Sequence, residues 1–212
     1  MIHPSFELAM DAERLFAWAH VAPQATPQWT HRGTAYSHRH YPVLRLSRTG
    51  QRELVWMRQG LIPAYAHDEG GAEEREAAHA ESLSCSSCYR SAFRRRRCIL
   101  PADHVTDLQH GPDRTGSMCS LALASGEIFG LAGVWETWSN DNGHPVETFA
   151  VVTTPVSAAM RHFADRIPVV IAEPDQDRWL YTGDVRDEPF DLLRALDVNT
   201  LQDWRLSPCL PA

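Results

Sequence analysis

Lysine is missing from this chain of 212 residues, because all 20 basic residues are arginine. A lysine amine is therefore not available to condense with an aldehyde, and the α-amino group of Met1 is the remaining amine for a Schiff base. A GC-rich coding sequence would explain this composition without any functional reason. With 27 acidic residues the net charge is −7, so the whole molecule repels a polyanion and any nucleic-acid site must be a local patch.

Long apolar runs are also missing. No run approaches the roughly 20 residues that a membrane span needs, and the first residues lack the basic and apolar halves of a signal peptide. We therefore expect a cytoplasmic, monomeric protein that contacts no membrane.

Cysteine is sparse, and the odd total of five favours reduced thiols over a disulfide framework. Cys85 and Cys88 have the spacing of a zinc half-site, which His79 or the pair His38 and His40 could complete. A structural zinc ion needs four ligands, and the sequence has no second Cys-x-x-Cys pair. We favour two exposed, metal-free thiols and expect neither a metal nor another cofactor.

Hydrophobic periodicity predicts strands in clusters with short helices between them. The expected helices are 9–20, 89–97, 155–163, 174–181 and 190–196, and the expected strands are 41–46, 52–57, 98–100, 120–124, 128–135, 148–153 and 167–172. Thr49 and Gly50 indicate a hairpin between the first two strands, and Pro101 is expected to end the third. The polar residues 68–81 predict a solvated loop that leads into a frayed helix. Clustered strands favour an α+β fold on a mostly antiparallel sheet.

Four segments of the sequence form a recognisable set of motifs when they are taken together. They read Arg-Gln-Gly-Leu-Ile-Pro at residues 58–63, Phe-Arg-Arg-Arg-Arg-Cys-Ile-Leu-Pro-Ala-Asp at 93–103, Leu-Ala-Gly-Val-Trp-Glu-Thr-Trp at 131–138, and Thr-Thr-Pro at 153–155 followed by Asp-Arg-Ile-Pro-Val-Val-Ile at 165–171. In this order and spacing they resemble the SRAP family, the SOS-response-associated, abasic-site-processing proteins. Weaker matches near both ends extend the resemblance over nearly the whole chain.

The resemblance implies a single α+β domain over residues 1–212, with a barrel-like core, peripheral helices and a groove for single-stranded DNA. Members of this family carry a cysteine directly after the first methionine. Its amine and thiol close a thiazolidine on the ring-opened aldehyde of an abasic site, which gives a DNA–protein crosslink. The same residue is thought to be released by self-processing, which explains the family's peptidase name.

The reactive positions of this chain differ from the family pattern. Ile2 stands where the family has cysteine, so we expect no thiazolidine, and Ile2 is too large for ordinary removal of Met1. The family's catalytic glutamate aligns with Asp107, and its catalytic histidine aligns with Ala164. His162, two residues earlier, could replace that histidine only if the backbone shifts.

Three further replacements affect the expected binding of DNA. His79 replaces an asparagine, and Glu81 replaces an arginine that faces DNA, which should repel phosphate. Gln59 replaces a tryptophan, so we expect that a stacking surface for a base is lost. The candidate catalytic residues are therefore Asp107, His79, His162 and Met1, with His104 or His79 as an acid–base partner of Asp107.

The candidate DNA-binding residues are Arg58, Arg94 and Arg166. For the run 94–97 we favour arginines that are solvated or paired with acids over a phosphate clamp. The preferred function is an SRAP-fold protein that binds single-stranded or abasic-site DNA, with covalent chemistry that is absent or altered. A weak lyase that uses the amine of Met1, a non-enzymatic DNA- or protein-binding module, and a different translation start that supplies a cysteine remain open alternatives.

Overall fold

The computed structural model describes residues 5–8, 12–23, 40–108, 119–158, 161, 164–183, 188–196 and 204–208. Within these ranges the α-helices are α1 (Ala12–Ala19), α2 (Arg90–Arg95) and α3 (Gln176–Leu180). The strands are β1 (Ser5–Glu7), β2 (His40–Leu46), β3 (Arg52–Gln59), β4 (Ala77–His79), β5 (Arg97–Ala102), β6 (His104–Leu108), β7 (Cys119–Leu123), β8 (Phe129–Ser139), β9 (Pro145–Pro155), β10 (Arg166–Pro168), β11 (Val170–Ile171) and β12 (Trp204–Pro208). None of the described helices is long and apolar enough to cross a membrane.

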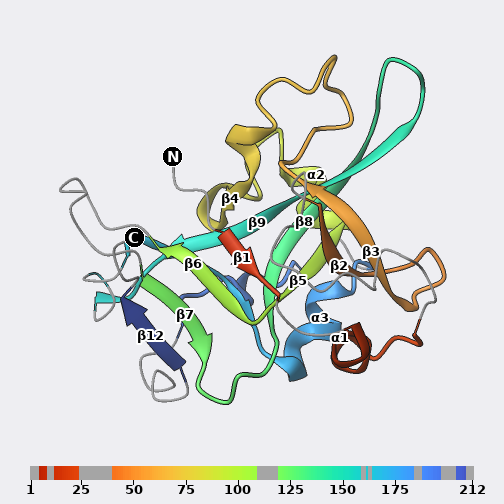
Figure 1. Ribbon diagram of the computed structural model, residues 1–212. Helices are drawn as coiled ribbons and strands as arrows, with labels where there is room; N and C mark the ends of the chain where they lie inside the picture. Colours follow the sequence, from red (N-terminus) through yellow and green to blue (C-terminus); the bar gives the residue numbers. More distant parts are fainter. Residues whose placement is uncertain are drawn as a thin grey trace.

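The strands form two sheets, which Figure 1 shows. The larger sheet has the order β10-β9-β3-β2-β5-β8-β11, with β4 paired to β9, and a further pairing of β8 with β9 closes five of its strands into a ring. The smaller sheet has the order β1-β6-β7-β12. Pairing is antiparallel except where β3 and β4 run parallel to β9. The predicted α+β fold, with a mostly antiparallel, barrel-like core, is confirmed.

The two faces of the ring bury separate clusters. Leu44, Ile99 and Val152 pack with side chains from all three helices, such as Phe93 of α2. Because helices cannot fit inside a ring of five strands, this face is the outside of the barrel. Alternation along a strand then turns the cluster that contains Met57, Leu100 and Phe149 toward the interior. Val105 and Leu121 of the smaller sheet join this inner cluster, so the smaller sheet packs against the barrel.

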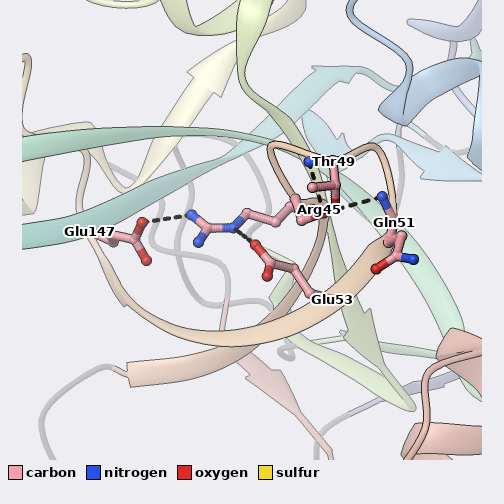
Figure 2. A network of polar contacts seen from close by, with 6 residues as sticks. Arg45, Thr49, Gln51, Glu53 and Glu147 are labelled. Carbon is pink, nitrogen blue, oxygen red and sulfur yellow. Dashed lines mark hydrogen bonds and ion pairs between the residues drawn. The ribbon is translucent and has the colours of Figure 1, made fainter.

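One end of the barrel interior is polar (Figure 2). The guanidinium of Arg45 bonds Glu53 Oε1 through Nε at 2.7 Å and Glu147 Oε1 through Nη1 at 2.6 Å. The same group lies 4.3 Å from the centre of the Trp135 ring. Burial opposes ionisation, but the two carboxylates outweigh it and raise the pKa of Arg45. The network ties the β2–β3 hairpin to β9.

Most predicted elements are present with shorter or longer bounds. The predicted first helix, the helix at 89–97 and the helix at 174–181 correspond to α1, α2 and α3. The hairpin corresponds to β2 and β3, with Gly50 at a φ of 78° in its turn. The predicted strand end at Pro101 is wrong, because Pro101 pairs with Gly130 inside β5. Strand β5 pairs with its other neighbour, β2, at Ile99. The sheet therefore tolerates the missing backbone N–H of Pro101.

Three other predictions differ from the structure or extend beyond it. The predicted helix at 155–163 does not start at Pro155, because β9 continues to that residue and the Val156 N–H donates to Asp165 O at 3.1 Å. Residues 159, 160, 162 and 163 of this prediction lie outside the described residues. The helix at 190–196 is reduced to a 3-10 turn, since Leu193, at φ −81° and ψ 59°, leaves the helical region. The expected solvated loop at 68–81 contains strand β4, whose Ala78 is fully buried.

Candidate functional site

Strand β9 brings two of the candidate residues together. His79 of β4 lies beside Thr153 on one edge of β9, and Arg166 of β10 lies beside Pro155 on the other edge. Residues 147, 149, 151 and 153 of β9 alternate onto the inner face, so Thr153 lies toward the end of the barrel opposite Glu147. The polar group around His79 and Arg166 is therefore distinct from the Arg45 network.

Arg166 forms the central contacts of this group. Its Nη1 and Nη2 donate to the two carboxylate oxygens of Glu81 at 2.9 and 2.7 Å. Its Nε donates to Thr153 Oγ1 at 3.2 Å, and Nη2 also donates to Thr153 O at 2.8 Å. A bidentate pair of this kind fixes the plane of the guanidinium. We call His79, Glu81, Thr153 and Arg166 the β9 cluster.

The charges in the β9 cluster are strongly coupled. The hydrogen bonds from Arg166 lower the pKa of Glu81 to about 2, so this carboxylate is ionised throughout the neutral range. Partial desolvation, followed by the positive charge of Arg166, lowers the pKa of His79. His79 is therefore a neutral imidazole at neutral pH, suited to accept a proton rather than to hold a phosphate by charge.

The backbone of Asp107 lies in β6, beside the first strand. Ser5 of β1 pairs with Thr106, the residue before Asp107. On the other edge of β6, Val105 pairs with Leu121 and Leu108 with Cys119, so three steps along β6 face two along β7. The register of β6 therefore shifts between Val105 and Leu108, the stretch whose backbone includes Asp107.

The inner cluster contains residues of both β6 and the segment around Arg166. Val105 of β6 belongs to it, as do Ala164 and Ile167, which lie close to Arg166 in the sequence. The strand that carries Asp107 and the segment that carries Arg166 thus contribute to one core. Met1 and His162 lie outside the described residues. His104, the other expected partner of Asp107, places its Nδ1 2.9 Å from Asp103 Oδ1.

The other two candidate arginines lie elsewhere. Arg58 bonds Glu69 at 2.6 Å, and Arg94 bonds Glu188 at 2.7 Å from α2, on the outer face. Arg96 similarly bonds Glu136 at 2.6 Å. Arg97 is buried, and its guanidinium donates to the backbone carbonyls of Phe93, Trp179 and Tyr181. Pairing with acids, rather than a free cationic run, is therefore confirmed for Arg94 and Arg96.

The sequence profile of the SOS response associated peptidase (SRAP) family matches residues 5–209. The chain belongs to the SRAP family. Among curated SRAP relatives, the abasic site processing protein YoqW of Bacillus subtilis is 29% identical over 152 residues, which cover 71% of this chain and 68% of YoqW. The abasic site processing protein YobE of the same organism is 31% identical over 152 residues, covering 71% of this chain and 69% of YobE.

Solved structures share the same fold. A protein from Bacteroides thetaiotaomicron superposes with a TM-score of 0.78 at 18% identity, covering 97% of this chain and 91% of the other. A protein from Bordetella bronchiseptica superposes with a TM-score of 0.78 at 19% identity, covering 99% and 100%. At this level of identity the likeness concerns the SRAP fold alone.

Two departures from the SRAP pattern lie in the barrel interior. Ala164, at the position of the family histidine, is fully buried. Gln59, at the position of the tryptophan, is only 5% exposed, and its Nε2 has no hydrogen-bond partner among the described residues. Gln59 is therefore a buried residue of this chain, and the loss of a stacking surface at this position stays a prediction.

Tyr65 is an exposed aromatic residue that follows Gln59 closely in the sequence, and the sequence analysis did not single it out. Its side chain is 63% exposed, and its Oη lies 3.6 Å from Cys88 Sγ. Arg75 holds the preceding segment, because its Nε donates to Leu61 O at 2.7 Å and its Nη2 to Gly70 O at 2.7 Å. The position of Tyr65, two residues after the matched segment 58–63, was the sequence signal for it.

A metal centre finds no support in the described part of the chain. No group of three or more histidine, cysteine or acidic side chains there could hold an ion. Cys85 is exposed, Cys88 is half-buried, and Cys98 is buried in the core.

Proposed function

We propose that this protein acts in abasic-site processing by recognising the lesion in single-stranded DNA, without forming the thiazolidine of its family. The observation that supports this most strongly is the β9 cluster, in which strand β9 holds His79 on one edge and the partly exposed Arg166 on the other, in a chain of the SRAP family. Relatives named abasic site processing proteins support the same role.

The residues suit recognition better than crosslinking. Position 2 is Ile2, so the thiol that would close the ring is absent there, and Ala164 offers no proton transfer. The neutral His79 and the carboxylate of Asp107 could still move protons at a ring-opened sugar. Arg166 is 20% exposed and supplies a cation for a flanking phosphate, in competition with Glu81. Tyr65 offers a face on which a base can stack.

A matched set of oligonucleotides tests the proposal. Single strands that carry an abasic site, a tetrahydrofuran analogue without an aldehyde, or an intact base are compared at one salt concentration. We expect the abasic and tetrahydrofuran strands to bind with similar affinity, more tightly than the intact strand. We also expect the intact mass of the protein to be unchanged after incubation with each strand. A heat-stable conjugate through the first residue would contradict the proposal.

The amine of Met1 gives a second measurement on the same samples. A transient imine with the abasic aldehyde would be trapped by borohydride as a stable secondary amine. Trapping that falls in Asp107→Asn but persists in Asp141→Asn, a substitution in an exposed turn, would assign a weak lyase activity to this chain. If wild-type protein gives no trapped product, the lyase activity is excluded and recognition of the lesion remains the proposed function.

A non-enzymatic module is the alternative that a specific observation favours. Each of the three candidate DNA-binding arginines has a glutamate partner, which reduces the positive charge offered to a polyanion. Equal and weak binding of all three strands would support a module for a protein partner instead of DNA.

A further inference from the structure

Two thiols lie close together in the sequence, shortly after Glu81 of the β9 cluster. Cys85 is exposed and Cys88 is half-buried, and only Ser86 and Ser87 separate them. Cys98, in contrast, is fully buried, and burial raises the pKa of its thiol, so it is not available to reagents in solution.

Two hydrogen-bonded turns meet at Ser86, between the two cysteines. Ser86 N–H donates to Ser82 O at 2.8 Å and so ends one turn, and Ser86 O accepts from Arg90 N–H at 2.9 Å and so begins the next. The side chain of Ser86 also accepts from Cys88 N–H at 3.3 Å, which is the pattern of a Ser turn. Cys85 therefore lies in the first turn and Cys88 in the second, with Ser86 at the junction, and a disulfide across the two intervening residues would rearrange this junction.

We propose that Cys85 and Cys88 are a redox-active dithiol that closes to an intramolecular disulfide by exchange with a low-molecular-weight disulfide. The Cys85 thiolate, the more exposed of the two, attacks one sulfur of glutathione disulfide and releases one glutathione thiolate. The Cys88 thiolate then attacks Cys85 Sγ and releases the second. The protein loses two S–H bonds and gains one S–S bond, while the reagent is reduced to two thiols.

Closure changes contacts that lead toward the β9 cluster. The Cys85 thiol donates to Ser82 O at 3.4 Å, and Ser82 Oγ donates to His79 O at 3.2 Å. Oxidation removes the Cys85 donor and pulls Cys88 Sγ relative to Tyr65 Oη. The dithiol is inferred from the thiols and the turn alone and does not depend on the proposed function.

The full-length protein, reduced and then incubated with glutathione disulfide, tests the proposal. After acid quenching, alkylation and trypsin digestion, one peptide, residues 76–90, contains both cysteines and no other. We expect this peptide to lose about 2 Da, the mass of two hydrogens, to resist alkylation and to recover after reduction. Cys209→Ser should behave as wild type.

The single variants distinguish closure from simple modification. Cys85→Ser and Cys88→Ser should each retain one glutathione as a stable mixed disulfide on this peptide, because the second thiol is missing. Circular dichroism checks that both variants remain folded. A wild-type peptide that stays alkylated at both cysteines, or that keeps bound glutathione, would overturn the proposal. Stoichiometric binding of added zinc that Cys85→Ser abolishes would overturn it in favour of a metal site.

Discussion

Glu81 controls how much positive charge Arg166 can offer to a phosphate. Both carboxylate oxygens of Glu81 accept from its guanidinium, and two further bonds hold Arg166 to Thr153. The guanidinium is thus held in position while its charge is neutralised. A DNA phosphate would have to displace Glu81 to bind Arg166.

Neutralising Glu81 should therefore strengthen DNA binding. We expect Glu81→Gln to raise the affinity for single-stranded DNA about fivefold, equivalent to about 1 kcal/mol, because Arg166 gains one phosphate contact. The slope of log K against log salt should steepen by about 0.7. Glu127→Gln removes the same charge from an exposed pair with Arg14 and is the matched control. Equal effects of the two variants would assign the gain to net charge alone.

The same carboxylate should make stability depend on pH. Hydrogen bonding to Arg166 lowers the pKa of Glu81 from 4.5 to about 2. A depressed pKa means that the contribution is fully present above about pH 4.5 and is lost as pH falls toward 2. Since the side chain is 52% exposed, we expect a contribution below about 1 kcal/mol. The difference in Tm between wild type and Glu81→Gln should close on acidification, and a constant difference would refute this.

Gln59 shows what a family resemblance leaves out. The resemblance aligns it with an aromatic position and does not predict its burial, which accompanies its pairing with Phe149 in the β3–β9 ladder. Burial of a single residue at a junction of two strands depends on long-range pairing. Local sequence patterns do not contain that information.

Replacing Gln59 by a residue without a polar group should stabilise the fold. Its buried Nε2 lacks a partner among the described residues, so Gln59→Leu should raise the free energy of unfolding by about 1 kcal/mol. Gln176 is equally buried but accepts from Arg52 Nη1 at 3.3 Å. Gln176→Leu should therefore destabilise the protein by about 1–3 kcal/mol. Urea unfolding of both variants measures the change in the free energy of unfolding, and a loss of stability in both would contradict the prediction.

At the scale of the element, the strands were easier to predict than the segment that builds the site. The β2–β3 hairpin, β8 and β9 have the β-branched and aromatic runs that indicate strands. Strand β4 reads only Ala-Ala-His and follows a polar stretch, so nothing in its composition separates it from a loop. Its parallel pairing with β9 is a tertiary event, and it is this pairing that carries His79 into the β9 cluster.

The turn that leaves β3 depends on one glycine. Gly60 has a φ of 100°, its N–H donates to Phe149 O at 2.9 Å, and a Cβ here would lie 2.6 Å from the carbonyl oxygen of Ala72. We expect Gly60→Ala to destabilise the fold by about 2–3 kcal/mol, since both strain and a backbone clash oppose the methyl group.

A second glycine provides the control for this turn. Gly126 has a φ of 73° with open space around its Cβ position, so Gly126→Ala carries only the conformational cost of about 1–2 kcal/mol. Because Gly60 leads into the segment that presents Tyr65, Gly60→Ala should also weaken DNA binding, whereas Gly126→Ala should not. Equal losses of stability in the two variants would contradict the clash at Ala72.

For the whole molecule, the distribution of charge matters more than the number of arginines. The net charge is −7. At least eight arginines of the described chain form ion pairs with acids: Arg14, Arg45, Arg52, Arg58, Arg94, Arg96, Arg166 and Arg178. These pairs hold strands and helices to one another, so at least eight of the chain's 20 arginines have an acidic partner that a phosphate would have to displace.

This distribution predicts a weak dependence of DNA binding on salt. For single strands the slope of log K against log salt is about −0.7 per neutralised phosphate. With Arg166 shared with Glu81, we expect no more than about two phosphate contacts and a slope no steeper than about −1.5. Titrations of a labelled single strand at several salt concentrations measure it. A slope near −3 would require about four phosphate contacts and would contradict this prediction.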